Sequence, residues 1–77
     1  MPSSIVTAQK TLAVNVRAAR KAMNISQEDL AFRAGIDRTY ASQIERALAN
    51  PSLGIVCAIG DALGLTAAEL LSSQKHL

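Results

Sequence analysis

The chain has 77 residues, of which 49% are apolar and 18% are charged, and its formal net charge is +2. This length predicts one domain, excludes a second and leaves little room for a large enclosed active site. The apolar content is too high for an intrinsically disordered chain, so we expect the chain to fold.

The first predicted element is an amphipathic helix in the N-terminal part. Its apolar stripe recurs at helical spacing at Leu12, Val16, Ala19 and Met23. The opposite face has the cations Lys10, Arg17 and Lys21. We therefore expect the stripe to pack on the core and the basic back to face solvent or a partner.

A second helix is predicted to begin at Gln27. Ser26 can cap this helix, and Ile25 and Leu30 stand at the two positions that form a hydrophobic staple. We expect the helix to end near Ala34.

A short connection leads from there to a third helix, predicted over about residues 37–46 with Asp37 as its cap. Gly35 can adopt the left-handed conformation that a sharp turn between two crossed helices needs. Ala31 is small where the helices must cross closely. Residues 27–46 are therefore predicted to form a helix-turn-helix.

The predicted third helix has a polar outer face. At 100° per residue, Ala41 and Ile44 lie on the inner side. The outer side groups Arg38, Thr39, Ser42, Gln43 and Arg46. In the DNA major groove arginine can bond guanine, glutamine can bond adenine, and a threonine methyl can meet the thymine methyl. The face is thus predicted to read bases, and an ordinary solvated helix face is the alternative.

Two further helices complete the prediction. Pro51 breaks the chain, and Ser52 can then cap an apolar helix over Leu53 to Leu63. Thr66 and Glu69 form a capping box that begins a fifth helix. No segment alternates with period two over a useful length, so the predicted fold class is all-α with five helices.

The fourth predicted helix has two unlike faces. Its bulky face contains Ile55, Val56, Ile59 and Leu63. The other face contains the smaller residues Gly54, Cys57 and Ala58, which would let another helix approach closely. We therefore expect a homodimer built mainly from the fourth and fifth helices.

Charge is unevenly distributed along the chain. Residues 1–46 contain seven cations and four acids, whereas residues 47–77 contain one cation and two acids. This asymmetry indicates that the N-terminal part meets a polyanion, although an ordinary solvated surface explains the charges equally well.

Four motifs stand at the predicted helix starts and ends: Ile25-Ser26-Gln27-Glu28-Asp29-Leu30-Ala31, Gly35-Ile36-Asp37-Arg38-Thr39-Tyr40, Ile44-Glu45-Arg46 and Asn50-Pro51-Ser52-Leu53. Together they resemble the phage repressor and Cro-like (Xre) helix-turn-helix family over residues 10–71. The Asp-Arg-Thr-Tyr start of the third helix is most similar to the small controller proteins of restriction–modification systems. The resemblance implies a five-helix, repressor-like DNA-binding domain, residues 1–77, that works as a homodimer on a two-fold operator.

The resemblance also implies the roles of individual residues. Gln27 would contact a phosphate. Base edges would be faced by Arg38, Thr39 and Gln43. DNA backbone or bases would be contacted by Tyr40, Ser42 and Arg46. Arg20 would pair with Glu45 inside the fold, which we favour over a DNA contact because a partly buried arginine needs a carboxylate partner.

The chain departs from the family pattern at two positions. Ala47 stands where family members commonly have glycine after the Glu-Arg pair, so we expect a strained or differently shaped exit from the third helix. Ala49 replaces a basic residue often found before Asn-Pro, which removes one phosphate contact.

The sequence offers no plausible catalytic or metal-binding group. It has one cysteine, Cys57, for which we expect a packed place in the core or in an interface, and one histidine, His76, near the C-terminus. No nucleophile and base are combined at a recognisable spacing. We therefore expect a protein that is not an enzyme and has no metal, cofactor or small-molecule ligand.

The predicted function is that of a sequence-specific transcription regulator that binds double-stranded DNA. The alternative is a protein-interaction module on the same fold, such as an antitoxin that binds a toxin, with DNA binding secondary or lost. The sequence shows no signal peptide and no apolar segment long enough to span a membrane, so we expect a cytoplasmic protein.

Overall fold

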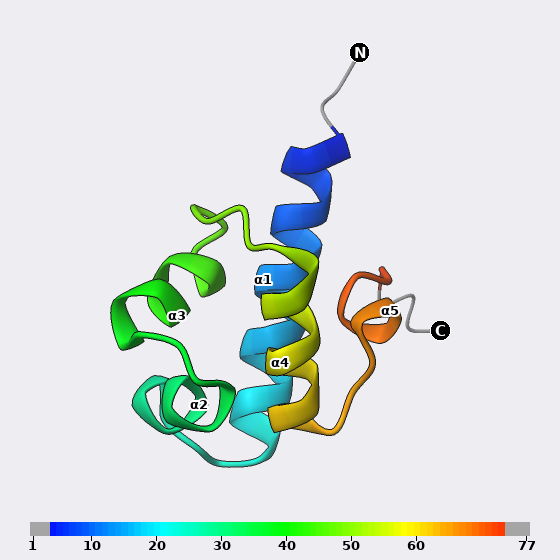
Figure 1. Ribbon diagram of the computed structural model, residues 1–77. Coiled ribbons are helices and arrows are strands. Elements are labelled where there is room, and N and C mark those ends of the chain that lie inside the picture. Colours follow the sequence, from blue (N-terminus) through cyan, green and yellow to red (C-terminus); the bar gives the residue numbers. More distant parts are fainter. Residues whose placement is uncertain (1–3, 74–77) are drawn as a thin grey trace.

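A computed structural model describes residues 4–73 of the chain. Five helices and no strand occur within these residues: α1 (Ser4–Ala22), α2 (Gln27–Ala34), α3 (Arg38–Glu45), α4 (Leu53–Leu63) and α5 (Ala67–Leu70). α1 and α4 lie along the middle of the molecule, with α2 and α3 on one side and the short α5 on the other (Figure 1). None of the helices in residues 4–73 is long and apolar enough to cross a membrane. His76 lies outside the described residues.

The capping side chains begin four of the five helices where the sequence predicts. Ser26 accepts a hydrogen bond from the Asp29 amide at 3.0 Å, and Asp37 accepts one from the Thr39 amide at 3.1 Å. Ser52 caps α4 in the same way. The predicted capping box at α5 is also confirmed, since the side chains of its two residues bond each other's backbone amides at 3.0 and 2.8 Å.

The core lies where α1, α2, α3 and α4 meet, and α5 closes it with Leu70. Its buried apolar side chains are Leu12, Val16, Leu30, Ile44, Ala49, Val56, Ile59, Leu63 and Leu70. The predicted stripe of the first helix is confirmed except at Met23, which is 40% exposed. α1 ends at Ala22, and Met23 falls in a turn that Asn24 closes with a left-handed φ of 59°.

One side of α4 forms core and the other side is open. Val56 and Ile59 are buried, whereas Gly54 and Cys57 are exposed. The prediction of a packed place in the core for Cys57 is therefore wrong, and its place in an interface stays a prediction. Gly60 is buried, and a Cβ there would collide with the Leu65 carbonyl group where the chain turns toward α5, so no larger residue fits.

A buried amide, marked by no motif of the sequence, ties α5 to α1. Asn15 is 6% exposed, and its Nδ2 donates to the carbonyl oxygens of Leu70 and Ser72, each at 2.8 Å. These carbonyls lie at the end of α5, where no further helical turn can satisfy them. Because a helix of four residues is not stable alone, this long-range contact helps to hold α5 in place.

The exit from α3 is strained, as the sequence predicts. Ala47 has a φ of 60°, in the left-handed region that costs a residue with a Cβ about 1–2 kcal/mol. Gly35, by contrast, takes a φ of 72° at the end of α2 without this cost.

Ala47→Gly should therefore raise the free energy of unfolding by about 0.5–1 kcal/mol. The stabilisation from relieving the strain exceeds the free-energy cost of the extra conformational entropy that glycine gives the unfolded chain. The matched change Ala18→Gly, at an exposed position inside α1, should lower the free energy of unfolding by about 1 kcal/mol. Urea unfolding of both variants checks the opposite signs. A loss of stability in Ala47→Gly would contradict the strained exit.

Candidate nucleic-acid interface

α2 and α3 pack against each other through small residues and a tight turn. Ala31 and Ala41 are 3% and 2% exposed. Beyond α2 the Gly35 and Ile36 amides bond back to carbonyls of the last helical turn, and Asp37 then caps α3. The predicted helix-turn-helix is therefore present, with α3 as its outer helix.

The outer side of α3 presents the polar face that the sequence predicts, with two refinements. Arg38 and Thr39 are exposed, whereas Ser42 and Gln43 are half-buried. Arg46 is exposed but stands after the last helical residue, where its amide closes the helix. The helix is thus one residue shorter at each end than the predicted range.

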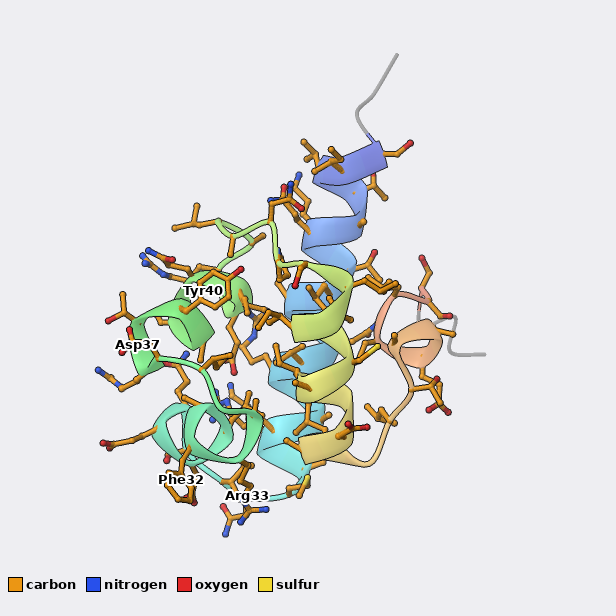
Figure 2. The ribbon with its side chains drawn as sticks, viewed as in Figure 1. Phe32, Arg33, Asp37 and Tyr40 are labelled. Carbon is orange, nitrogen blue, oxygen red and sulfur yellow. The ribbon has the colours of Figure 1, made fainter. Side chains whose placement is uncertain are left out.

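Tyr40 lies partly in the core and partly at the surface of α3. Figure 2 shows it on α3 one turn after Asp37, while Phe32 and Arg33 project from α2 away from the body. Tyr40 is half-buried and packs against the core. This packing fixes the ring on α3 and leaves part of it at the surface beside the polar face.

A buried ion pair connects α1 to the end of α3. The Arg20 Nε donates to Glu45 Oε2 at 2.6 Å, and its Nη2 donates to Oε1 at 3.0 Å. The two side chains are 13% and 1% exposed, so the predicted pair inside the fold is confirmed. This bidentate bond raises the pKa of the Arg20 guanidinium above its ordinary value, against the opposing effect of burial.

Gln27 joins the same carboxylate, a contact that no motif of the sequence indicates. Its Nε2 donates to Glu45 Oε1 at 3.2 Å. An amide nitrogen has two hydrogens, so this bond orients the side chain at the start of α2 and leaves one donor for another acceptor.

Arg17, one of the cations predicted on the basic back of α1, is half-buried and bonded within the fold. Its Nη1 donates to the backbone carbonyl oxygen of Glu45 at 2.7 Å. The buried face of α1 is wider than the predicted stripe, because Ala13 is also buried. Arg17 follows Ala13 by one helical turn and therefore shares its side of the helix.

No group of three or more His, Cys, Asp or Glu side chains within residues 4–73 is arranged to hold a metal ion. The polar surface described so far is built from amide, hydroxyl and guanidinium groups, which recognise hydrogen-bond acceptors and anions.

Comparison with known proteins agrees with this architecture. A helix-turn-helix family model (HTH_3) matches residues 16–70. The control protein C.SmaI of Serratia marcescens is 38% identical over 66 residues, which are 86% of this chain and 79% of that protein.

Two solved structures are similar over most of the chain. The hypothetical transcription factor NHTF from Neisseria is 39% identical, with a TM-score of 0.83 over 86% of this chain and 76% of that one. The restriction-modification controller protein C.AhdI from Aeromonas hydrophila is 35% identical, with a TM-score of 0.77 over 80% of this chain and 94% of that one.

The ion pair predicts a stability effect. Arg20→Ala or Glu45→Ala should each lower the free energy of unfolding by about 2–4 kcal/mol, because either change leaves a partly or fully buried charge without its partner. The double variant should lose less than the sum of the two. Glu28→Ala, which removes an exposed acid from α2, should change stability by no more than about 0.5 kcal/mol. Thermal or urea unfolding measures all four, and wild-type stability in Arg20→Ala would contradict the importance of the pair.

Proposed function

This chain belongs to the helix-turn-helix family whose model matches residues 16–70, and we propose that it is a transcription regulator that binds DNA sequence-specifically through α3. One observation carries the proposal. α3 is anchored by a buried inner face and presents guanidinium, hydroxyl and amide donors on its outer face. The DNA major groove is wide enough for an α-helix, and its base edges can bond such donors.

The residues at the start of α3 are proposed to read bases. Arg38 and Thr39 are exposed in the first turn, and recognition helices of this kind present their N-terminal residues to base edges. Gln43 lies on the same side about one turn later, where its amide can form two bonds with adenine.

Four further residues are proposed to hold the DNA backbone or neighbouring bases. Gln27 stands at the start of α2, already oriented by Glu45, and its second amide hydrogen is available for a phosphate. Tyr40, Ser42 and Arg46 border the polar face of α3. Those of the contacts that go to the backbone set the position of the helix on the duplex and do not choose its sequence.

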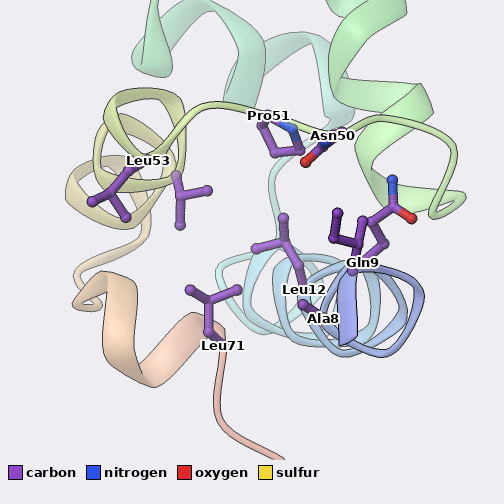
Figure 3. Close-up of a pocket in the computed structure, with 9 residues that line it drawn as sticks. Ala8, Gln9, Leu12, Asn50, Pro51, Leu53 and Leu71 are labelled. Carbon is purple, nitrogen blue, oxygen red and sulfur yellow. The ribbon is translucent and has the colours of Figure 1, made fainter. Parts of the chain in front are cut away.

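The active form is proposed to be a homodimer that pairs through α4 and α5. Leu53 and Leu71 are 68% and 40% exposed, and both border an apolar groove of about 260 Å³ (Figure 3). On the same helix Gly54 and Cys57 are exposed and small, so another helix could approach α4 closely there. A second copy would cover these apolar groups and double the number of phosphate contacts, which a chain with a net charge of +2 needs for useful affinity.

A two-fold dimer of this kind predicts a near-palindromic operator with half-sites centred about 34 Å apart. In vitro selection with the full chain should recover such a motif. Arg38→Ala should lower affinity for it by about 1–3 kcal/mol and relax the preference at one symmetric base pair, most simply a G·C pair. Arg33→Ala removes an exposed arginine from the last turn of α2 and should retain affinity and preference. Failure to enrich any motif would support the antitoxin-type alternative.

Gln27→Ala should behave differently from Arg38→Ala. Loss of a phosphate contact should weaken binding to the selected operator and to unrelated duplex by a similar factor and leave the preferred sequence unchanged. Because Gln27 also bonds Glu45, unfolding must be measured on the same sample. A changed sequence preference would place Gln27 at base edges.

The proposed interface predicts the oligomeric state of two matched variants. Sedimentation of the wild-type chain at about 10–100 μM should show a dimer. Leu53→Glu should shift it to monomer, because the carboxylate would be buried against an apolar surface. Phe32→Glu makes the same kind of change at the 86%-exposed Phe32 on α2 and should leave the dimer intact. A monomeric wild type, or dissociation by Phe32→Glu alone, would contradict a dimer through α4 and α5.

A further inference from the structure

A hollow lies where α1 passes the end of α3, at the edge of the polar face of α3. Its volume is about 330 Å³, and it is lined by Lys10, Ala13, Val14, Arg17, Glu45, Arg46 and Ala47. Three of these residues are cations, and they come from two helix turns of α1 and from the exit of α3.

The charges around the hollow favour an anion. The acid in its lining, Glu45, has its carboxylate bound by Arg20 on the other side, so it does not cancel the three cations. Lys10 and Arg46 are exposed, and their charged groups are therefore hydrated and able to turn toward a ligand.

Arg17 is fixed in advance at this place. Its Nη1 is held by the Glu45 carbonyl oxygen at 2.7 Å, which leaves the other guanidinium hydrogens for a second acceptor. A guanidinium that is already oriented loses less entropy on binding a phosphate than a free one does.

The position of the hollow decides which anion reaches it. Arg46 borders the polar face of α3 and also lines the hollow, so a duplex read by α3 would bring its backbone next to these cations. We propose that Lys10, Arg17 and Arg46 bind a DNA phosphate that flanks the bases read by α3. This inference rests on the proposed function and adds α1 to the DNA-binding surface.

The salt dependence of DNA binding tests the proposal. Affinity is measured between 50 and 300 mM salt for the selected operator and for a duplex of unrelated sequence, with wild type, Lys10→Gln and Lys21→Gln. Lys21 is exposed in the last turn of α1 and does not line the hollow, so it is the matched control for the lost charge. Lys10→Gln should lower the slope of log affinity against log salt by about 1 and weaken binding about three- to tenfold at 0.1 M salt on both duplexes. Lys21→Gln should keep the wild-type slope.

Arg17→Gln should show the same loss of slope, and unfolding of this variant separates DNA binding from the structural bond to Glu45. Ethylation interference locates the site: ethylation of one phosphate per half-site should weaken binding of wild type, and it should weaken binding of Lys10→Gln less, because Arg17 and Arg46 still contact that phosphate. Equal slopes and affinities for Lys10→Gln and Lys21→Gln, with wild type still selecting an operator, would overturn the phosphate site and leave the proposed function standing. A wild type that binds neither duplex would overturn both.

Discussion

The rest of the structure depends on the hydrogen bonds that the buried carboxylate of Glu45 accepts. This carboxylate stands at the last residue of α3, is 1% exposed, and accepts hydrogen bonds from Arg20 of α1 and Gln27 of α2. The carbonyl of the same residue accepts a further bond from Arg17. A buried carboxylate is stable only when its acceptor sites are filled, so these donors must stay in place together. One residue therefore fixes three helices relative to one another.

This anchor explains how a small domain can present a rigid polar helix. α2 and α3 are only eight residues each, too short to be stable alone, and their packing through Ala31 and Ala41 holds them together. The Glu45 network then ties this pair to the long α1. The outer face of α3 can consequently stay polar and solvated without loss of its position, which sequence-specific recognition requires.

An apolar surface is exposed on a different part of the molecule from the cations near α3. The cations near α3 belong to α1 and to the helix-turn-helix, whereas the open side of α4 and the end of α5 are apolar around Leu53 and Leu71. Asn15 connects the two halves, because it lies on α1 and holds the carbonyls at the end of α5. In the proposed complex, a DNA duplex and a second copy of the chain would occupy different sides of the same core.

The sequence by itself determined the helices, their caps and the turn at Gly35, because each depends on neighbours within a few residues. The strain at Ala47 was expected from the glycine that the family pattern commonly has at this position. The sequence also indicated the pairing of Arg20 with Glu45 and the outer face of α3, the first by family resemblance and the second by helical periodicity. Only the tertiary structure decided the partners of Arg17 and Asn15, which lie 28 and 55 residues away. Periodicity assigns a side chain to a helix face, but the angle at which two helices cross decides which distant carbonyl that face meets.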